Sequence, residues 1–122
     1  MLEPAAIRKV DRSRMIDIVL SLPEQLLEGY RAAQTLHLEA GDADRVYIAG
    51  MGGSAIAGDI FVSWASDASK VRMEVVRGYS LPGAARKEDV LIAVSYSGDT
   101  EETLSAFESA AMTADRPPRR TR

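Results

Sequence analysis

The sequence contains no cysteine, which excludes a disulfide framework, thiolate chemistry and a zinc site built on sulfur. It has one histidine, His37, which we interpret as a surface side chain near a helix end rather than as a catalytic acid or base. No stretch approaches the roughly 18 apolar residues of a spanning helix, and the first residues lack the apolar run of a signal peptide. We therefore expect a soluble cytoplasmic protein without a membrane partner.

A strong excess of charge is also lacking, because 15 lysines and arginines face 18 aspartates and glutamates, for a net charge of −3. No basic face is evident before the last residues, which argues against a nucleic-acid partner. The length of 122 residues suffices for one domain with a real core. The composition, 46% hydrophobic and 27% charged, is that of an ordinary globular protein.

The chain is organised around residues 45–59, which read RVYIAGMGGSAIAGD. The first part predicts a short buried strand, and Gly50, Gly52 and Gly53 then let the backbone turn without a Cβ between its N–H groups and a ligand. Ser54 stands where a helix is expected to begin, so its hydroxyl and the free N–H groups suit an anion, most often a phosphate. The alternative is a plain strand-to-helix turn that only needed glycine.

A second loop of matching chemistry follows an almost wholly apolar strand, residues 89–94, which we expect at the centre of the sheet. Its hydroxyls belong to Ser95, Ser97 and Thr100, where another helix is expected to begin. Asp99 or Thr100 can cap that helix. We interpret the following Glu101 and Glu102 as favourable charges at the positive end of its dipole rather than as catalytic groups.

Between the loops, a helix over residues 54–65 and a strand over residues 70–76 are predicted. We expect the helix to turn four large apolar side chains to the sheet: Ile56, Ile60, Phe61 and Trp64. Arg77 follows the strand at the edge where open α/β sheets bind ligands, and both a surface role and a role near a ligand stay open.

Before the first loop, residues 1–10 read as a lead-in, followed by two amphipathic helices. The first is capped by Asp11, and the second runs from Pro23 to about Leu38 with Leu26, Leu27, Tyr30 and Ala33 on its buried side. The fold class is thus α/β, a doubly wound parallel sheet with two N-terminal helices laid against it. We expect N-terminal helices over 1–40, the sheet domain over 41–112 and a disordered Arg/Pro tail over 113–122.

Two other ligand classes fit the loops less well. Gly50-x-Gly52-x-x-Ala55 matches a relaxed dinucleotide pattern, but no acid ends the second strand to hold a ribose. A Walker-type site is excluded because no Gly-Lys-Ser/Thr follows a glycine run. Four hydroxyls can instead surround one phosphate without a metal or cofactor, with roughly 1.5–3 kcal/mol for each hydrogen bond to the charged group. These hydroxyls belong to Ser54, Ser95, Ser97 and Thr100.

The two loops also resemble a known family. Gly-Met-Gly-Gly-Ser at 50–54 and Ser-Tyr-Ser-Gly-Asp-Thr-Glu-Glu-Thr at 95–103 are similar to the sugar isomerase (SIS) domain, which is flavodoxin-like. With the segments around 11–15 and 22–25, they resemble more narrowly the bifunctional phosphoglucose/phosphomannose isomerases. The resemblance implies that the four hydroxyls bind a sugar phosphate and that Gly52 and Gly53 shape the loop. Family members more often carry asparagine at the position of Asp99.

The resemblance covers about residues 7–112, the first part of a much longer family member with two SIS domains and, as implied, a homodimer. The family's catalytic glutamate, arginine and histidine would lie beyond residue 122, so no catalytic residue is mapped. We expect an aldose–ketose isomerase that acts on glucose 6-phosphate or mannose 6-phosphate. This chain would carry the phosphate-binding loops of that enzyme and would be inactive alone. The alternatives are a non-catalytic sugar-phosphate-binding module and a dinucleotide-binding domain.

Overall fold

The computed structural model describes residues 3–37 and 43–114, and the chain divides into two compact units, Met1–Glu39 and Ala40–Arg122. Each unit is described by itself, so the packing of the N-terminal helices on the sheet stays a prediction. The expected tail over 113–122 begins too early, because residues 113 and 114 end the last helix, and residues 115–122 lie outside the described residues. Among the described helices, none combines the length and the apolar character that crossing a membrane requires.

The first unit contains three helices, α1 (Pro4–Val10), α2 (Met15–Leu20) and α3 (Leu22–Ala33). The prediction of a lead-in over residues 1–10 was wrong, because proline at the first helical turn suits the start of α1. The capping role of Asp11 is confirmed: its carboxylate accepts the N–H groups of Met15 at 2.8 Å and Ile16 at 2.9 Å. The bond from Ile16, then that from Met15, holds the pKa of Asp11 below its usual value.

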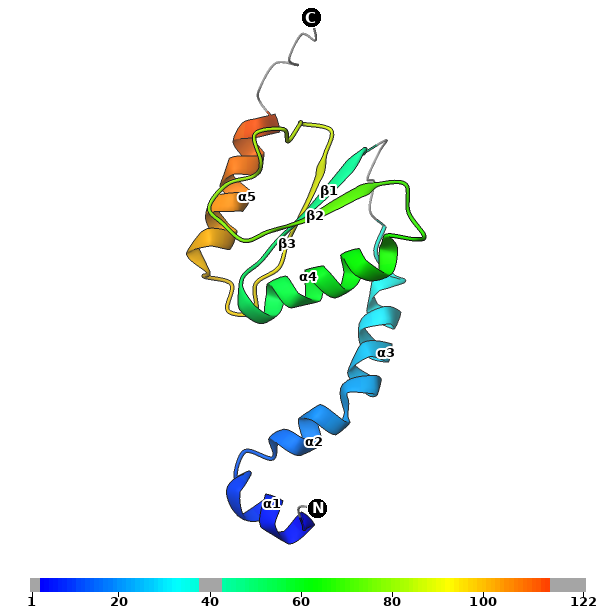
Figure 1. Cartoon of the computed structure of the whole chain (residues 1–122), viewed down its shortest axis with the longest axis vertical. Helices are drawn as coiled ribbons and strands as arrows, with labels where there is room; N and C mark the ends of the chain where they lie inside the picture. The colour runs from blue at the N-terminus through cyan, green and yellow to red at the C-terminus, as the bar shows by residue number, and fades with distance from the viewer. Residues whose placement is uncertain (1–2, 38–42, 115–122) are drawn as a thin grey trace, which may run out of the picture. The chain divides into compact units, whose positions relative to one another are not determined.

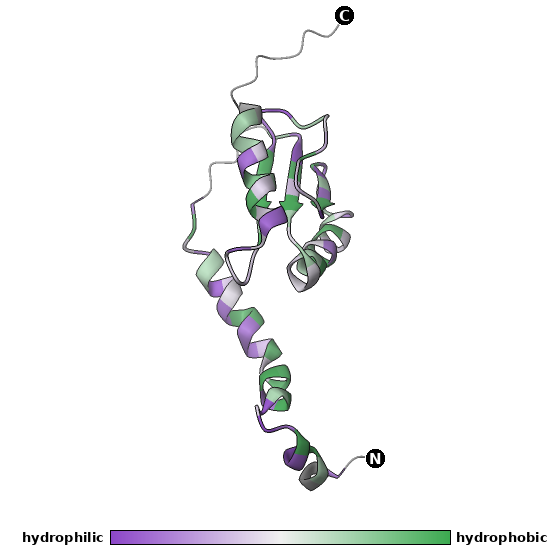
Figure 2. Cartoon of the chain, turned by 90° about the vertical axis from the view of Figure 1, so that its left-hand side faces the viewer, coloured by the Kyte–Doolittle hydropathy of each residue, from purple (hydrophilic) through white to green (hydrophobic). Residues whose placement is uncertain are grey.

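Helix α3 ends at Ala33, earlier than the expected end near Leu38, and that last residue lies outside the described part. Within the first unit, nothing covers the predicted buried side of this helix, since Leu26, Leu27 and Tyr30 are all exposed there. The amphipathic pattern is present, since hydrophobic and hydrophilic residues alternate along the helix (Figure 2) at a spacing that gives it one apolar face. The pattern therefore indicates a contact face but not the surface that covers it.

The second unit is built on a parallel sheet of β1 (Arg45–Ala49), β2 (Arg72–Val76) and β3 (Val90–Ala93), in the order β2-β1-β3. Ala49 at the end of β1 pairs with Val76 on one side and Ala93 on the other. The prediction that the strand over residues 89–94 is central was wrong, because β1 takes the centre of the described sheet. An apolar run signals burial, but β3 leaves Ile92 42% exposed at the edge.

Helices α4 (Gly52–Ala65) and α5 (Glu101–Ala114) cover opposite faces of this sheet (Figures 1 and 2). Gly58 of α4 lies against Ile48, whereas Ala106 of α5 belongs to a buried cluster with Tyr47. Because successive side chains of a strand point to opposite faces, Tyr47 faces α5 and Ile48 faces α4. The predicted α/β class with helices on both faces is confirmed.

The face that α4 turns to the sheet differs from the prediction. Its buried residues are Ala55, Gly58 and Ala65. The four side chains expected there are 41% to 73% exposed: Ile56, Ile60, Phe61 and Trp64. A Cβ added at Gly58 would lie 3.0 Å from the Ile48 Cγ2 atom, so the helix approaches the strands too closely for larger residues. Small side chains, not large apolar ones, form this contact.

The segment between β2 and β3, residues 77–89, contains no helix or strand and lies on the α5 side of the sheet. Leu81 and Ala85 from this segment pack against the buried cluster of Tyr47, Ala49, Val76 and Ala106. The hydroxyl of Ser105 on α5 donates a hydrogen bond to the Tyr79 carbonyl at 2.7 Å. An irregular segment thus takes the place that a crossover helix often has in such folds.

Candidate functional site

The two predicted loops lie at the same edge of the sheet, because each follows the carboxyl end of one of two neighbouring parallel strands, β1 and β3 (Figure 1). They touch at their bases: the Val94 N–H donates to the Ala49 carbonyl at 2.8 Å. A Cβ added at Gly50 would lie 3.2 Å from the Val94 carbonyl oxygen. This edge is where open α/β sheets bind ligands.

In the first loop, residues 50–54, two glycines have a structural reason and one does not. Gly50 is enclosed by backbone, since an added Cβ would also lie 3.2 Å from the Ser54 carbonyl carbon and 3.3 Å from the Ala55 nitrogen. Gly52 adopts φ 54°, a left-handed conformation that side-chain-bearing residues rarely adopt. Gly53 has open space around it and no such conformation. The loop is therefore shaped mainly by Gly50 and Gly52.

Helix α4 begins two residues earlier than expected, at Gly52, with Met51 as a cap that makes no side-chain capping bond. Ser54 consequently lies inside the first turn, and its N–H donates to the Met51 carbonyl at 3.1 Å. The structure records no hydrogen bond of the Ser54 hydroxyl with any described residue. The N–H groups of Gly52 and Gly53 precede the first helical hydrogen bond and are available to a ligand.

In the second loop, residues 95–100, the three predicted hydroxyls come together. The Thr100 hydroxyl lies 3.1 Å from that of Ser95 and 3.4 Å from that of Ser97. Gly98 supplies the tight turn between them with φ 82°. We call these three side chains the hydroxyl cluster, and it stands directly before the first turn of α5.

Backbone donors orient the hydroxyl cluster. The Gly98 N–H donates to the Ser95 hydroxyl at 3.0 Å, and the Asp99 N–H donates to the Ser97 hydroxyl at 3.4 Å. A hydroxyl that accepts a bond from the backbone keeps its own proton to donate. The two contacts within the cluster take up two of its three hydroxyl protons, so one proton is left for an acceptor such as a phosphate oxygen.

Charged side chains around the two loops are acidic or already paired. Neither loop contains a lysine or arginine, so favourable charge at the site comes from the N-terminal ends of α4 and α5. Arg77, whose role the sequence left open, pairs with Asp59 of α4. Asp99 and Glu101 are exposed. Within the described residues, no three histidine, aspartate or glutamate side chains gather to hold a metal ion.

Two residues near this edge were not singled out from the sequence. Thr103 is 4% exposed, and its hydroxyl has no hydrogen-bond partner among the described residues. Its position three residues after Thr100 signals the same helix face. The pKa of Tyr79 is raised, mainly by the negative charge of Glu102. Partial burial and the negative charge of Glu101 contribute less. No local pattern brings Tyr79 to α5, because that contact depends on the path of residues 77–89.

The recorded cavities of this unit lie away from the loops. One of about 560 Å³ is lined by residues from the amino ends of β1 and β2, including Arg45, Lys70 and Arg72. Another of about 130 Å³ lies beside Tyr47 and the segment before β3. No residue of either loop lines them, and His37 is an exposed residue of the other unit.

Comparison with known proteins gives a family match that includes both loops. The SIS domain matches residues 41–113, which contain both loops and the helices and strands of the second unit except the last residue of α5. The chain belongs to the SIS domain family. A bifunctional phosphoglucose/phosphomannose isomerase of Caldicellulosiruptor bescii is 41% identical over 98 residues, which are 79% of this chain and 29% of the relative. One of Thermoplasma volcanium is 48% identical over 73 residues, 60% of this chain and 23% of the relative.

The SIS chain thus spans less than a third of the length of these curated relatives. No solved structure matches it significantly. The resemblance to the bifunctional isomerases that the loops indicated is confirmed, and the SIS match ends one residue beyond the predicted boundary at 112.

Proposed function

We propose that this SIS chain binds the phosphate of a hexose 6-phosphate between its two loops. It would form the phosphate end of the substrate site of an aldose–ketose isomerase that interconverts glucose 6-phosphate or mannose 6-phosphate with fructose 6-phosphate. The observation that carries the proposal is the hydroxyl cluster, whose serines are oriented by backbone N–H groups beside a glycine loop. The relatives are phosphoglucose/phosphomannose isomerases by name, which supports the choice of substrate.

The phosphate would be held by neutral donors from both loops. Gly52 and Gly53 offer N–H groups and Ser54 offers a hydroxyl on one side, and the hydroxyl cluster offers three hydroxyls on the other. Both helices point their positive ends at this place, which favours an anion without a lysine or arginine. Each hydrogen bond to a charged phosphate is worth roughly 1.5–3 kcal/mol, so three of them suffice for a small metabolite.

The part played by this chain is binding rather than proton transfer. Isomerisation needs a base within about 2.6–3.2 Å of the proton that it abstracts. The nearby carboxylates have other roles, since Asp59 pairs with Arg77 and Glu101 and Glu102 begin α5. We therefore expect no conversion of mannose 6-phosphate to fructose 6-phosphate by the purified 122-residue chain in a coupled assay. Conversion would make one of these carboxylates, or Asp99, the base.

A thermal-shift series separates this proposal from its rivals. Glucose 6-phosphate should raise the melting temperature, whereas glucose should not, because only the phosphate meets the donors of both loops. NAD and NADP test the dinucleotide-binding alternative, and stabilisation by a dinucleotide alone would contradict the sugar-phosphate proposal. His37→Ala is the control variant, and it should respond to glucose 6-phosphate as the unmodified chain does.

A further inference from the structure

The backbone of Tyr79 is fixed to α5 at the edge that carries the loops. Its carbonyl accepts the 2.7 Å hydrogen bond from Ser105, and Leu81 two residues later packs on the buried cluster. Ser105 lies one helical turn after Glu101, where α5 begins. The segment after β2 therefore lies along the first turns of the helix that follows the hydroxyl cluster.

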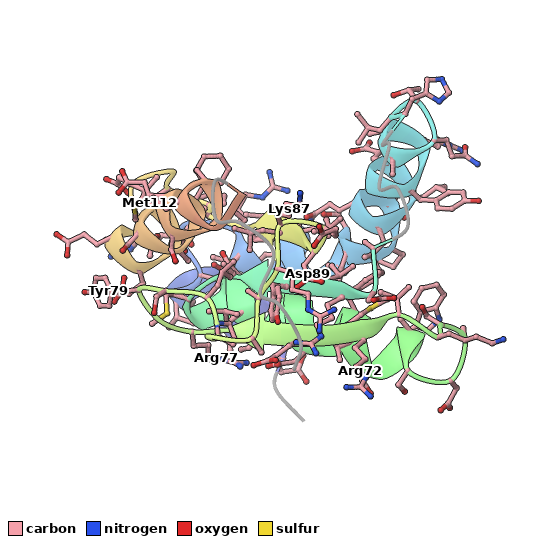
Figure 3. The ribbon with its side chains drawn as sticks, turned by 90° about the horizontal axis from the view of Figure 1, so that it is seen from above. Arg72, Arg77, Tyr79, Lys87, Asp89 and Met112 are labelled. Carbon is pink, nitrogen blue, oxygen red and sulfur yellow. The ribbon has the colours of Figure 1, made fainter. Side chains whose placement is uncertain are left out.

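The side chain of Tyr79 lies beside the beginning of α5 (Figure 3). The residue is 56% exposed and so is accessible to a ligand. The phenol can donate a hydrogen bond, and the negative charge of Glu102, the first cause of a raised pKa at Tyr79, lies close enough to act on it. Thr100 of the hydroxyl cluster immediately precedes the same first turn. A third segment of the chain thus lies beside the helix that follows the second loop.

We propose that Tyr79 contacts the sugar part of a sugar phosphate whose phosphate is held by the two loops, an inference that rests on the proposed function. Phosphate oxygens only accept hydrogen bonds, whereas sugar hydroxyls both donate and accept. Tyr79 and Glu102 together offer this pair of functions, a phenol donor and a carboxylate acceptor. The ring also offers an apolar surface to the C–H groups of a sugar.

The structural role of this residue is separable from its side chain. The hydrogen bond from Ser105 goes to the backbone carbonyl, which any residue at position 79 provides. Tyr79→Phe keeps the ring and removes only the phenol oxygen, so the fold of the segment should be retained. A loss of binding in this variant therefore reports a contact of the phenol and not a change of the loop.

The test compares two probes, glucose 6-phosphate and inorganic phosphate, by calorimetric titration of the 122-residue chain. Tyr79→Phe should weaken glucose 6-phosphate binding about 2- to 12-fold, the range of one neutral hydrogen bond, and should leave the affinity for inorganic phosphate unchanged. Tyr79→Ala, which also removes the ring, should weaken glucose 6-phosphate further. Tyr30→Phe, the same change on an exposed tyrosine of the other unit, should alter neither affinity.

The outcomes separate the two levels of the argument. Unchanged affinity for glucose 6-phosphate in both Tyr79 variants, with a normal response of the unmodified chain, overturns the role of Tyr79 and leaves the phosphate site standing. Equal losses for both probes in Tyr79→Phe also overturn it, because the phenol would then act on the phosphate loops. Absence of binding of either probe to the folded, unmodified chain overturns the proposed function and this inference with it.

Discussion

The two strand-to-helix junctions of the second unit reach the same edge by different means. The junction from β1 to α4 is a matter of backbone shape: Gly50 is enclosed by backbone atoms and Gly52 adopts a positive φ. The junction from β3 to α5 is a matter of side chains, because three hydroxyls and two backbone N–H groups form one hydrogen-bonded cluster. The first junction offers mainly backbone N–H groups to an anion, and the second offers clustered hydroxyls.

This difference indicates what substitutions should do at each junction. A change at Gly50 or Gly52 acts on the backbone and should appear mainly in the free energy of unfolding. A change in the hydroxyl cluster removes a donor from an exposed or half-buried side chain and should appear mainly in ligand affinity. Substitutions at the two junctions should therefore differ in whether they change the free energy of unfolding or the ligand affinity.

The largest effect is expected from Ser97→Ala. This change removes one charge-assisted hydrogen bond to the phosphate and should weaken glucose 6-phosphate binding by roughly 1.5–3 kcal/mol. The free energy of unfolding should change little, because Ser97 is exposed. Calorimetric titration measures the affinity, with Ser66→Ala at the far end of α4 as the matched control. Unaltered binding would mean that the second loop only begins its helix.

Gly52→Ala should destabilise the second unit by about 1–2 kcal/mol, the cost of a left-handed conformation for a residue with a Cβ. Gly53→Ala, one residue later, should cost nothing, because no atom lies within 4 Å of its added Cβ and its φ is ordinary. Urea denaturation of both variants measures the difference. Equal free energies of unfolding would contradict a shape role for Gly52.

Thr103→Val should stabilise the unliganded chain by about 1 kcal/mol. The buried Thr103 hydroxyl has no partner among the described residues, and valine replaces it with an apolar group of similar shape. The same denaturation experiment reports this gain. A loss of stability would show that the hydroxyl has a hydrogen-bond partner, and Thr103→Ser would then be expected to preserve it.

The smallest effect is expected from Asp99→Asn. Removing an exposed negative charge beside the hydroxyl cluster should tighten phosphate binding by about 0.5 kcal/mol, the scale of exposed charge interactions. The gain should shrink at high salt, because screening weakens the repulsion in the unmodified chain. Titration at low and high ionic strength distinguishes this charge effect from a change in helix capping. A gain that does not depend on salt would exclude the charge explanation.

Much of the second unit was predictable because its signals are local. An apolar run followed by glycines or hydroxyls predicted both junctions, and the geometry of parallel strands placed their ends at one edge. The contact face of α4 was not predictable from the count of large apolar residues, since Gly58 and its small neighbours determine how closely the helix lies. The order of the strands likewise depends on which strands pair, and the apolar run of β3 does not indicate its partners.

The candidate site was predictable in part for the same reason. Ser95, Ser97 and Thr100 are close in sequence, so their clustering follows from one turn at Gly98. Tyr79 lies beside α5 because its segment packs there, where Ser105, distant in sequence, donates a hydrogen bond to the Tyr79 carbonyl. Contacts of this kind depend on the tertiary path of an irregular segment, and no spacing in the sequence reports them.

The central claim is that both loops bind one phosphate together. Backbone amide chemical shifts measured by nuclear magnetic resonance during titration with glucose 6-phosphate test it most directly. The account predicts that the amides of Gly52 and Gly53 in the first loop and of Gly98 and Asp99 in the second shift along one binding curve. Lys70 and Arg72, which line the cavity at the other end of the strands, should not shift. Shifts at one loop only, at that cavity, or with two different affinities would contradict the claim.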